Sequence, residues 1–332
     1  RALRDAGDRA SALASPRTAA RFYARAIEIA AEDEPDPELL FLLGRARIEK
    51  GTGEGEEDLK RAAEGLVARG QRGRAAEALV NLYDSTWHAA RSQDELLERA
   101  RELVADEGAT YSRGYVVATL GRFYGLGGRP EEAIPLDEEA IAIAEELGDR
   151  ELLVYALNNL GIARCATGDF TGLSYVERSL EIGLEIGSGD VARAYINIGS
   201  ITEQLGDVAR AEEVHRAGVE AARRTENDIE ERWVRSELVN DWYRLGRWDD
   251  ALQAIEALPV NRDEPRYMDG MVVATGVLIA EARGTRPGVD DLEWLARLGQ
   301  TLGDPQALLP ALSWAARLAE AAGEHEHARR YL

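Results

Sequence analysis

The sequence predicts an all-α fold in which helical hairpins stack into a right-handed superhelical solenoid without a β-sheet. The main observation is a repeat of glycines that are 40, 38, 40, 38 and 39 residues apart, at Gly128, Gly168, Gly206, Gly246, Gly284 and Gly323. A period of about 39 residues accommodates two helices and their turns. Hydrophobic residues make up 45% of the chain but aromatic residues only 6%, which indicates helices packed through small and medium side chains.

Each of these glycines follows a helical stretch, where a residue with positive φ ends the helix and reverses the chain. In four repeats an alanine lies five residues later, at Ala133, Ala211, Ala251 and Ala328. A small residue one turn into the second helix lets the two helices of a hairpin approach closely. Pro130 and Asp207 suit the first turn and the N-cap of such second helices.

A second row of small residues lies seven residues before the turn, where an apolar residue is followed by Gly44, Gly121, Gly161 or Gly199. A glycine inside a helix costs roughly 0.5–1 kcal/mol relative to alanine. Four instances at the same place in the repeat therefore indicate a packing requirement. We expect these glycines on the first helix of each hairpin, against the second.

The pattern resembles the tetratricopeptide repeat (TPR). The matching residues are Val117, Leu120, Gly121, Tyr124, Gly128, Ala133 and Ala140, and in the first repeat Leu3, Gly7, Ala19, Tyr23 and Ala26. The repeat is four to six residues longer than the roughly 34 residues of that family, so the array is TPR-like. The resemblance implies that the first helices line the concave side of the superhelix.

The repeat register predicts one domain over residues 1–332. Earlier turns are expected near Ala14, Gly51 and Ser92, which makes about eight hairpins and a truncated last one. The pattern is strongest from Gly114 to Ala257, and we expect a bend near residues 259–268. Because the chain begins with Arg1 and stops within a helical pattern, we expect it to be a piece of a larger protein.

Composition and charge exclude several classes of partner. Lys and Arg total 40 against 61 Asp and Glu, a net charge of −21 that repels nucleic acid. The single cysteine, Cys165, excludes an internal disulfide and fits a reducing cytoplasm. No apolar run reaches the roughly 20 residues that span a bilayer, so no membrane partner is expected.

A search for catalytic or metal-binding patterns predicts no cofactor, no metal and no catalytic activity. The glycines from Gly125 to Gly128 lie at a helix turn, where a phosphate loop is not expected. His325 and His327 are two residues apart, a spacing that does not place both on one helix face. We expect the histidines, His215 included, on the solvated surface, and only Glu203 and Glu237 as inward acids.

The predicted binding site is the concave face of the regular repeats. Its residues are Tyr115, Arg122, Tyr155, Asn158, Asn159, Arg193, Asn197, Ser200, Trp233, Asn240 and Tyr243. Asparagines can hold the amides of an extended peptide, and aromatic rings can supply apolar pockets. Alternatively, the concave face is polar because it is solvated, and its aromatics fill gaps between hairpins. If the asparagines bind a ligand, replacing Asn159 and Asn197 by alanine should weaken binding by roughly 1–3 kcal/mol and barely change the melting temperature.

Three segments, Leu3–Ala26, Tyr155–Ala163 and Glu177–Gly183, resemble the C-terminal helical arrays of bacterial multidomain signalling proteins. In such proteins an AAA-type or STAND ATPase, often with a class III adenylate/guanylate cyclase domain or a LuxR-type DNA-binding domain, precedes the array. The resemblance implies a protein- or peptide-binding module, with the protein's own upstream domains among the candidate partners. A small-molecule-sensing groove is the alternative, and an enzyme with unrecognised carboxylate chemistry is the third hypothesis.

Overall fold

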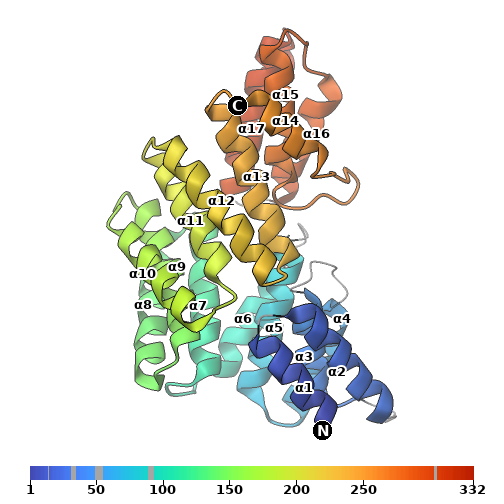
Figure 1. Ribbon diagram of the computed structural model, residues 1–332, viewed down its shortest axis with the longest axis vertical. Coiled ribbons are helices and arrows are strands. Elements are labelled where there is room, and N and C mark those ends of the chain that lie inside the picture. The colour runs from blue at the N-terminus through green and yellow to red at the C-terminus, as the bar shows by residue number, and fades with distance from the viewer. Residues whose placement is uncertain (14, 31–34, 49–54, 89–92, 303–304) are drawn as a thin grey trace.

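The computed structural model describes residues 1–332 except 14, 31–34, 49–54, 89–92 and 303–304 (Figure 1). The described residues form helices and no strand. The helices are α1 (Ala2–Ala12), α2 (Pro16–Ala30), α3 (Pro37–Ile48), α4 (Glu56–Ala68), α5 (Arg72–His88), α6 (Asp94–Val104), α7 (Tyr111–Leu126), α8 (Pro130–Leu147), α9 (Arg150–Ala166), α10 (Gly172–Ile186), α11 (Val191–Gln204), α12 (Val208–Arg224), α13 (Asp228–Arg244), α14 (Trp248–Glu256), α15 (Asp269–Ala282), α16 (Val289–Leu302), α17 (Pro305–Ala321) and α18 (His325–Tyr331). No described helix is long and apolar enough to span a membrane.

The periodic glycines end helices as the sequence predicts. Each lies two residues beyond the last residue of a helix, with φ between +74° and +92°. Because glycine has no Cβ, it adopts this left-handed conformation without a steric penalty. The other turns expected near Ala14, Gly51 and Ser92 lie outside the described residues.

The odd-numbered and even-numbered helices pair as hairpins, and the glycines inside the first helices allow close packing. A Cβ on Gly121 would lie 2.2 Å from Oδ1 of Asp137, and one on Gly199 would lie 2.2 Å from Nε2 of His215. Ala133 and Ala211, which follow the turns, are fully buried. Both small-residue patterns therefore serve the packing that the sequence analysis expected.

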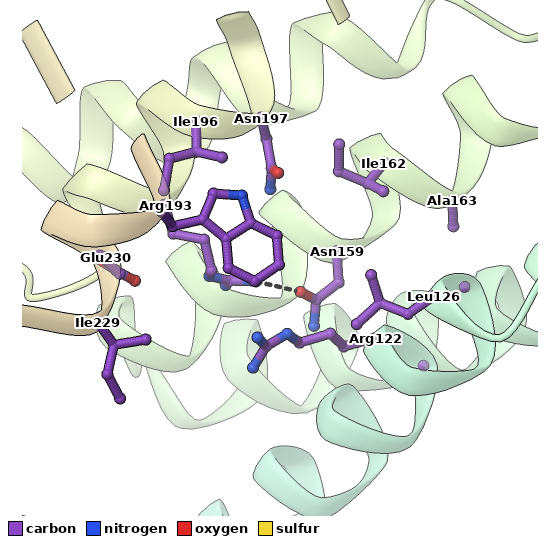
Figure 2. Close-up of a pocket in the computed structure, with 13 residues that line it drawn as sticks. Arg122, Leu126, Asn159, Ile162, Ala163, Arg193, Ile196, Asn197, Ile229 and Glu230 are labelled. Atoms are coloured by element: carbon purple, nitrogen blue, oxygen red, sulfur yellow. Dashed lines mark hydrogen bonds between the residues drawn. The ribbon is translucent and has the colours of Figure 1, made fainter. Parts of the chain in front are cut away.

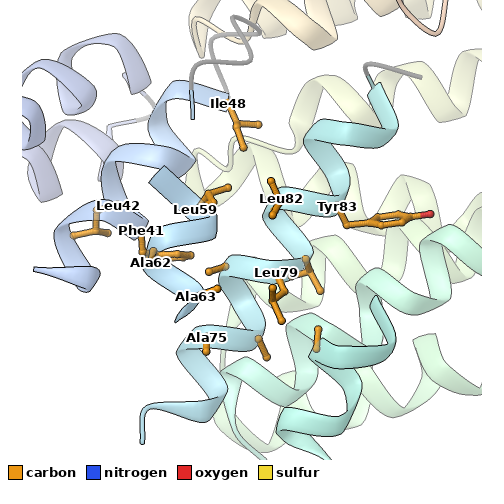
Figure 3. Packing of buried hydrophobic residues seen from close by; sticks show 14 of the residues in the cluster. Phe41, Leu42, Ile48, Leu59, Ala62, Ala63, Ala75, Leu79, Leu82 and Tyr83 are labelled. Atoms are coloured by element: carbon orange, nitrogen blue, oxygen red, sulfur yellow. The ribbon is translucent and has the colours of Figure 1, made fainter. Parts of the chain in front are cut away.

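The N-terminal hairpins pack through alanine and leucine, with few aromatic rings. Figure 3 shows Phe41 and Leu59 against Ala62, Ala63 and Leu79 at the junction of α3, α4 and α5. Leu59 and Ala62 have no exposed surface, and the others are also buried. Burial of these side chains stabilises each hairpin against the next.

The superhelix closes on itself across a large sequence separation. Arg17, at the start of α2, donates two hydrogen bonds of 2.5 and 2.7 Å to the carboxylate of Asp228, at the start of α13. These residues are 211 positions apart in sequence. This ion pair therefore brings the start of α2 next to the start of α13.

An aromatic cluster also joins distant hairpins. Trp87 of α5 stacks on Tyr267, with ring centroids 4.3 Å apart, and Tyr267 stacks on Trp233 of α13 at 5.2 Å. Tyr267 belongs to the segment that connects the short α14 to α15, which is longer than turns such as residues 225–227. We propose that the superhelix bends in this segment, near residues 259–268.

Candidate functional site

The first helices of consecutive hairpins present equivalent residues to the inner surface. Tyr115, Tyr155, Arg193 and Trp233 are spaced by 40, 38 and 40 residues, and they lie on α7, α9, α11 and α13. These neighbouring odd-numbered helices contact one another, so the four side chains form one row. Residues at equivalent positions of consecutive repeats therefore form one continuous inner surface.

Two adjoining cavities open on this surface, with volumes of about 90 and 410 Å³. Arg122, Arg193, Ile229 and Glu230 line both. Figure 2 shows the smaller cavity, in which side chains from α7, α9, α11 and α13 converge. The larger cavity extends to Ser11 in α1 and the α12–α13 turn, where the superhelix closes. The two cavities, which we call the interior, therefore lie along the regular repeats.

Seven of the predicted site residues line this interior: Tyr115, Arg122, Tyr155, Asn159, Arg193, Asn197 and Trp233. Asn158, Ser200, Asn240 and Tyr243 do not line either cavity. Asn158 has no exposed surface, so a ligand contact by its side chain does not fit the structure.

The other three polar residues are engaged by neighbouring groups. The Ser200 hydroxyl donates to the Ile196 carbonyl at 2.9 Å, within its own helix. Asn240 donates to Glu203 at 2.9 Å. Tyr243 packs against the C-terminal core. We therefore remove these residues from the candidate site.

The two arginines that line both cavities, Arg122 and Arg193, are held by partners on other parts of the array. Arg122 donates to Asp84 of α5 at 2.8 Å. Burial alone would lower the pKa of Arg122, but the Asp84 carboxylate outweighs this effect and raises it. Arg193 donates to Oδ1 of Asn159 at 2.7 Å and lies over the Tyr155 ring, 4.5 Å from its centroid. Both guanidinium groups are thus fixed and charged.

The asparagines of the predicted site, which we call the asparagine ladder, form hydrogen bonds between hairpins, so their amides are engaged within the protein. Asn159 donates to the Ala118 carbonyl of α7 at 2.9 Å and accepts from Arg193 of α11, so one side chain joins three hairpins. Asn197 donates to Asn158 of the preceding hairpin. The amides form hydrogen bonds within the protein because the odd-numbered helices lie close enough for their side chains to meet.

Replacing Asn159 by alanine should therefore destabilise the protein. The Ala118 carbonyl and the Arg193 guanidinium would each lose a partner, which costs roughly 1–3 kcal/mol. Urea unfolding of the Asn159→Ala variant measures the loss, with Gln204→Ala, an exposed amide at the end of α11, as control. An unchanged free energy of unfolding would show that the Asn159 hydrogen bonds do not stabilise the fold and would favour the interpretation that the asparagines bind a ligand.

Glu230 is a site residue that the sequence analysis missed. It lines both cavities, and its Oε2 atom is buried without a hydrogen-bond partner among the described residues. Burial and the nearby Asp190 raise the pKa of Glu230 to about 8. The statement that only Glu203 and Glu237 are inward acids is wrong. The sequence spacing could have identified it, because Glu230 lies three residues before Trp233 and therefore on the same face of α13.

The two expected acids lie beside the cavities without lining them. Glu203 accepts from Asn240 and pairs with Arg244. Glu237 accepts from the Trp233 indole at 3.2 Å, and burial raises its pKa to about 7. Asp84, Glu151 and Asp190 also line the larger cavity, but Glu230 is the acid there whose buried oxygen has no hydrogen-bond partner among the described residues, and it is our candidate for contact with a ligand.

The raised pKa of Glu230 predicts that stability falls as pH rises. The folded state holds the proton up to about pH 8, whereas the unfolded chain releases it near its ordinary pKa of 4.5. The stabilisation is complete below the unfolded pKa and is lost as pH rises through the folded pKa. Since each pKa unit corresponds to about 1.4 kcal/mol, the contribution amounts to a few kcal/mol at most.

Urea unfolding at about pH 5 and about pH 9 checks this prediction. Wild type should lose more stability across the range than Glu230→Gln, which has no carboxyl group to titrate. Glu145→Gln, an exposed residue on α8, should behave as wild type. Equal pH dependence in Glu230→Gln and wild type would contradict the assignment.

His215 corrects the expectation that the histidines are solvated. Its side chain has no exposed surface, and its Nδ1 lies 2.6 Å from Oδ2 of Asp241. Nε2 faces the Ile196 carbonyl at 3.3 Å. Burial alone would lower the pKa of His215, but the Asp241 carboxylate and the carbonyl outweigh it and raise the pKa. These contacts favour the protonated imidazole, and the ring is accommodated because Gly199 has no side chain.

Cys165 is buried in α9, as the sequence analysis allowed, and burial raises the pKa of its thiol. A raised pKa disfavours the reactive thiolate. In the described part of the chain no group of three or more His, Cys, Asp or Glu side chains could hold a metal ion.

Comparison with known proteins identifies the fold. No protein-family model and no curated protein matches the sequence. Among solved structures, a Rap protein crystallised with Competence and Sporulation Factor is similar, with a TM-score of 0.65 and 14% identity over 99% of this chain and 94% of that one. A STAND ATPase with a tetratricopeptide repeat sensor from Pyrococcus horikoshii is similar with a TM-score of 0.50 and 14% identity. That match covers 94% of this chain but 52% of the ATPase. The chain has the TPR-like helical-repeat fold.

Proposed function

We propose that this chain is a non-catalytic binding module whose interior binds a peptide segment and that it relays this binding to an attached signalling domain. The observation that carries the proposal is the pair of adjoining cavities between α7, α9, α11 and α13. Aromatic rings, two fixed arginines and one unpartnered carboxylate oxygen meet there. Such a mixture can contact both the side chains and the main chain of a peptide.

The shape and polarity of the interior favour a peptide over a compact apolar ligand. The larger cavity has a volume of about 410 Å³ and is lined by polar residues that include Arg45, Asn81, Asp84 and Asn227. It extends from the inner surface of α7 and α9 to the closing contact of the superhelix. A small-molecule sensor remains the second candidate, since the smaller cavity is bordered by Ile162, Ile196 and Trp233.

The two similar structures support a regulatory role. The Rap protein, which shares its fold along nearly the whole length of both chains, was crystallised with Competence and Sporulation Factor. The Pyrococcus horikoshii protein carries its repeats as the sensor of a STAND ATPase. We propose by analogy that ligand binding here controls an ATPase or a nucleotide cyclase in the parent protein.

The contacts that close the superhelix can transmit the effect of ligand binding to the two ends of the array. A ligand between α9 and α13 contacts hairpins that also meet through Arg17 and Asp228 and through the Trp87 cluster. Since each hairpin contacts its neighbours, a small change in their packing alters the relative position of the two ends of the array.

The proposal is tested by selecting peptides from a random octapeptide display library on the wild-type protein. The same pool is then bound to Ile162→Trp, which fills the smaller cavity, and to Leu184→Trp, which adds the same group at an exposed position on α10. We expect Ile162→Trp to bind at least roughly ten-fold more weakly and Leu184→Trp to bind as wild type. Thermal melts establish that both variants are folded.

Two outcomes would contradict the peptide proposal. One is a selection that enriches no peptide, and the other is a selected pool that binds Ile162→Trp as well as wild type. If no peptide is enriched and a metabolite library raises the melting temperature of wild type but not of Ile162→Trp, the small-molecule candidate replaces it.

A further inference from the structure

The side chain of Glu230 indicates which chemical group of a ligand the interior could bind. Its Oε2 atom is buried and has no hydrogen-bond partner among the described residues. A buried carboxylate oxygen without a partner is costly, and a donor supplied by a ligand would remove that cost. Figure 2 shows the Glu230 side chain directed from α13 toward the interior, on the side of Arg193.

Arg122 and Arg193 act electrostatically on Glu230, but their hydrogen bonds go to other groups. Arg122 donates to Asp84 at 2.8 Å, and Arg193 donates to Asn159 at 2.7 Å. The Arg193 guanidinium is also held over the Tyr155 ring. Because these partners lie on α5 and α9, they orient both arginines independently of Glu230. The buried Oε2 atom of Glu230 is therefore available to a hydrogen-bond donor from outside the chain.

The surroundings of Glu230 suit the stem of a long basic side chain. Ile229 and Ile196 border the same cavity, and Trp233 lies one turn further along the same face of α13. Arginine and lysine place methylene groups along apolar surface while the charged end meets a carboxylate.

We propose that the corner formed by Glu230, Ile229 and Trp233 binds the arginine or lysine side chain of a peptide ligand. This inference rests on the proposed function, and it names the ligand as a basic peptide. The net charge of −21 agrees with it, since an acidic protein attracts a basic ligand at long range. Burial and Asp190 raise the pKa of Glu230 to about 8 in the empty site, although Arg193 and Arg122 act in the opposite direction, and a bound cation would favour the ionised carboxylate.

The test uses one octapeptide selected on the wild-type protein that contains an arginine or lysine. A second peptide is identical except that citrulline replaces the arginine, or norleucine the lysine, which removes the charge and keeps the length. Both are titrated calorimetrically into wild type, Glu230→Gln and the exposed control Glu145→Gln. A thermal melt of each variant confirms folding.

The charged peptide should bind wild type and Glu145→Gln roughly ten- to hundred-fold more tightly than the neutral one, as expected for a charge-assisted hydrogen bond. On Glu230→Gln the two peptides should bind within about three-fold of each other. If the preference for charge persists on Glu230→Gln, or if the selected peptides carry no excess of basic residues, this inference is wrong while the peptide-binding function stands. If no peptide is selected at all, the proposed function fails and this inference fails with it.

Discussion

Replacing Asp241 by alanine should lower the free energy of unfolding by about 3–5 kcal/mol, the largest loss that we expect from a single polar residue. Asp241 and His215 are fully buried, and their side chains are 2.6 Å apart. Without the Asp241 carboxylate, a protonated His215 would keep only the electrostatic support of Glu237, and a neutral His215 would lose its hydrogen-bond partner at Nδ1. Either result destabilises the packing of α12 against α11 and α13, because His215 also faces the Ile196 carbonyl.

Urea unfolding of Asp241→Ala, His215→Ala and the double variant measures this effect. The double variant should lose less stability than the sum of the single variants, because it leaves no unpaired charge. Asp241→Asn keeps the volume and separates loss of charge from loss of packing. Losses below about 1 kcal/mol in both single variants would contradict the assignment of a buried ion pair.

The second large effect is expected at Trp87, where Trp87→Ala should cost about 3–5 kcal/mol and open the superhelix. The indole is 5% exposed, and it stacks on Tyr267 and on Trp233 with centroid distances of 4.3 and 6.1 Å. Its edge also meets the Phe123 ring. Removing it leaves a cavity at the junction of three sequence-distant parts of the array.

Small-angle X-ray scattering reports the opening, and urea unfolding reports the lost stability. Trp87→Ala should have a larger radius of gyration than wild type, whereas Trp87→Phe keeps an aromatic ring and should remain closed. Arg17→Ala removes the exposed ion pair at the other contact and should cost at most about 1 kcal/mol. A Trp87→Ala protein with the stability and radius of wild type would show that the cluster does not hold the array closed.

The parts of the fold that repeat could be predicted from the sequence. Glycines such as Gly168 and Gly206 recur because every hairpin needs the same left-handed turn, and local chemistry alone requires glycine there. Gly121 and Gly199 recur because each first helix meets its second helix in the same way. Periodicity cannot, however, reveal what fills the space they leave, which is Asp137 in one hairpin and His215 in the other.

The candidate site was predicted only in part, since its details depend on contacts between different hairpins. The sequence register correctly placed Tyr155, Arg193 and Trp233 on the inner surface. It could not tell that the Asn159 amide reaches across two hairpin boundaries, nor that Arg17 meets Asp228 when the superhelix closes. Such pairs are set by superhelical curvature, which no single repeat encodes.

The central claim is that a ligand binds in the interior between α9 and α13, and photo-crosslinking tests it most directly. The photoreactive residue p-benzoylphenylalanine is placed at Tyr111 of α7, an aromatic position that lines the larger cavity, or at Leu184 on the exposed surface of α10. Each protein is irradiated with the selected octapeptides, and the crosslinked products are identified by mass spectrometry. We predict that the peptide is attached at position 111 and not at position 184. Attachment at position 184 alone, or at neither position, would contradict the claim.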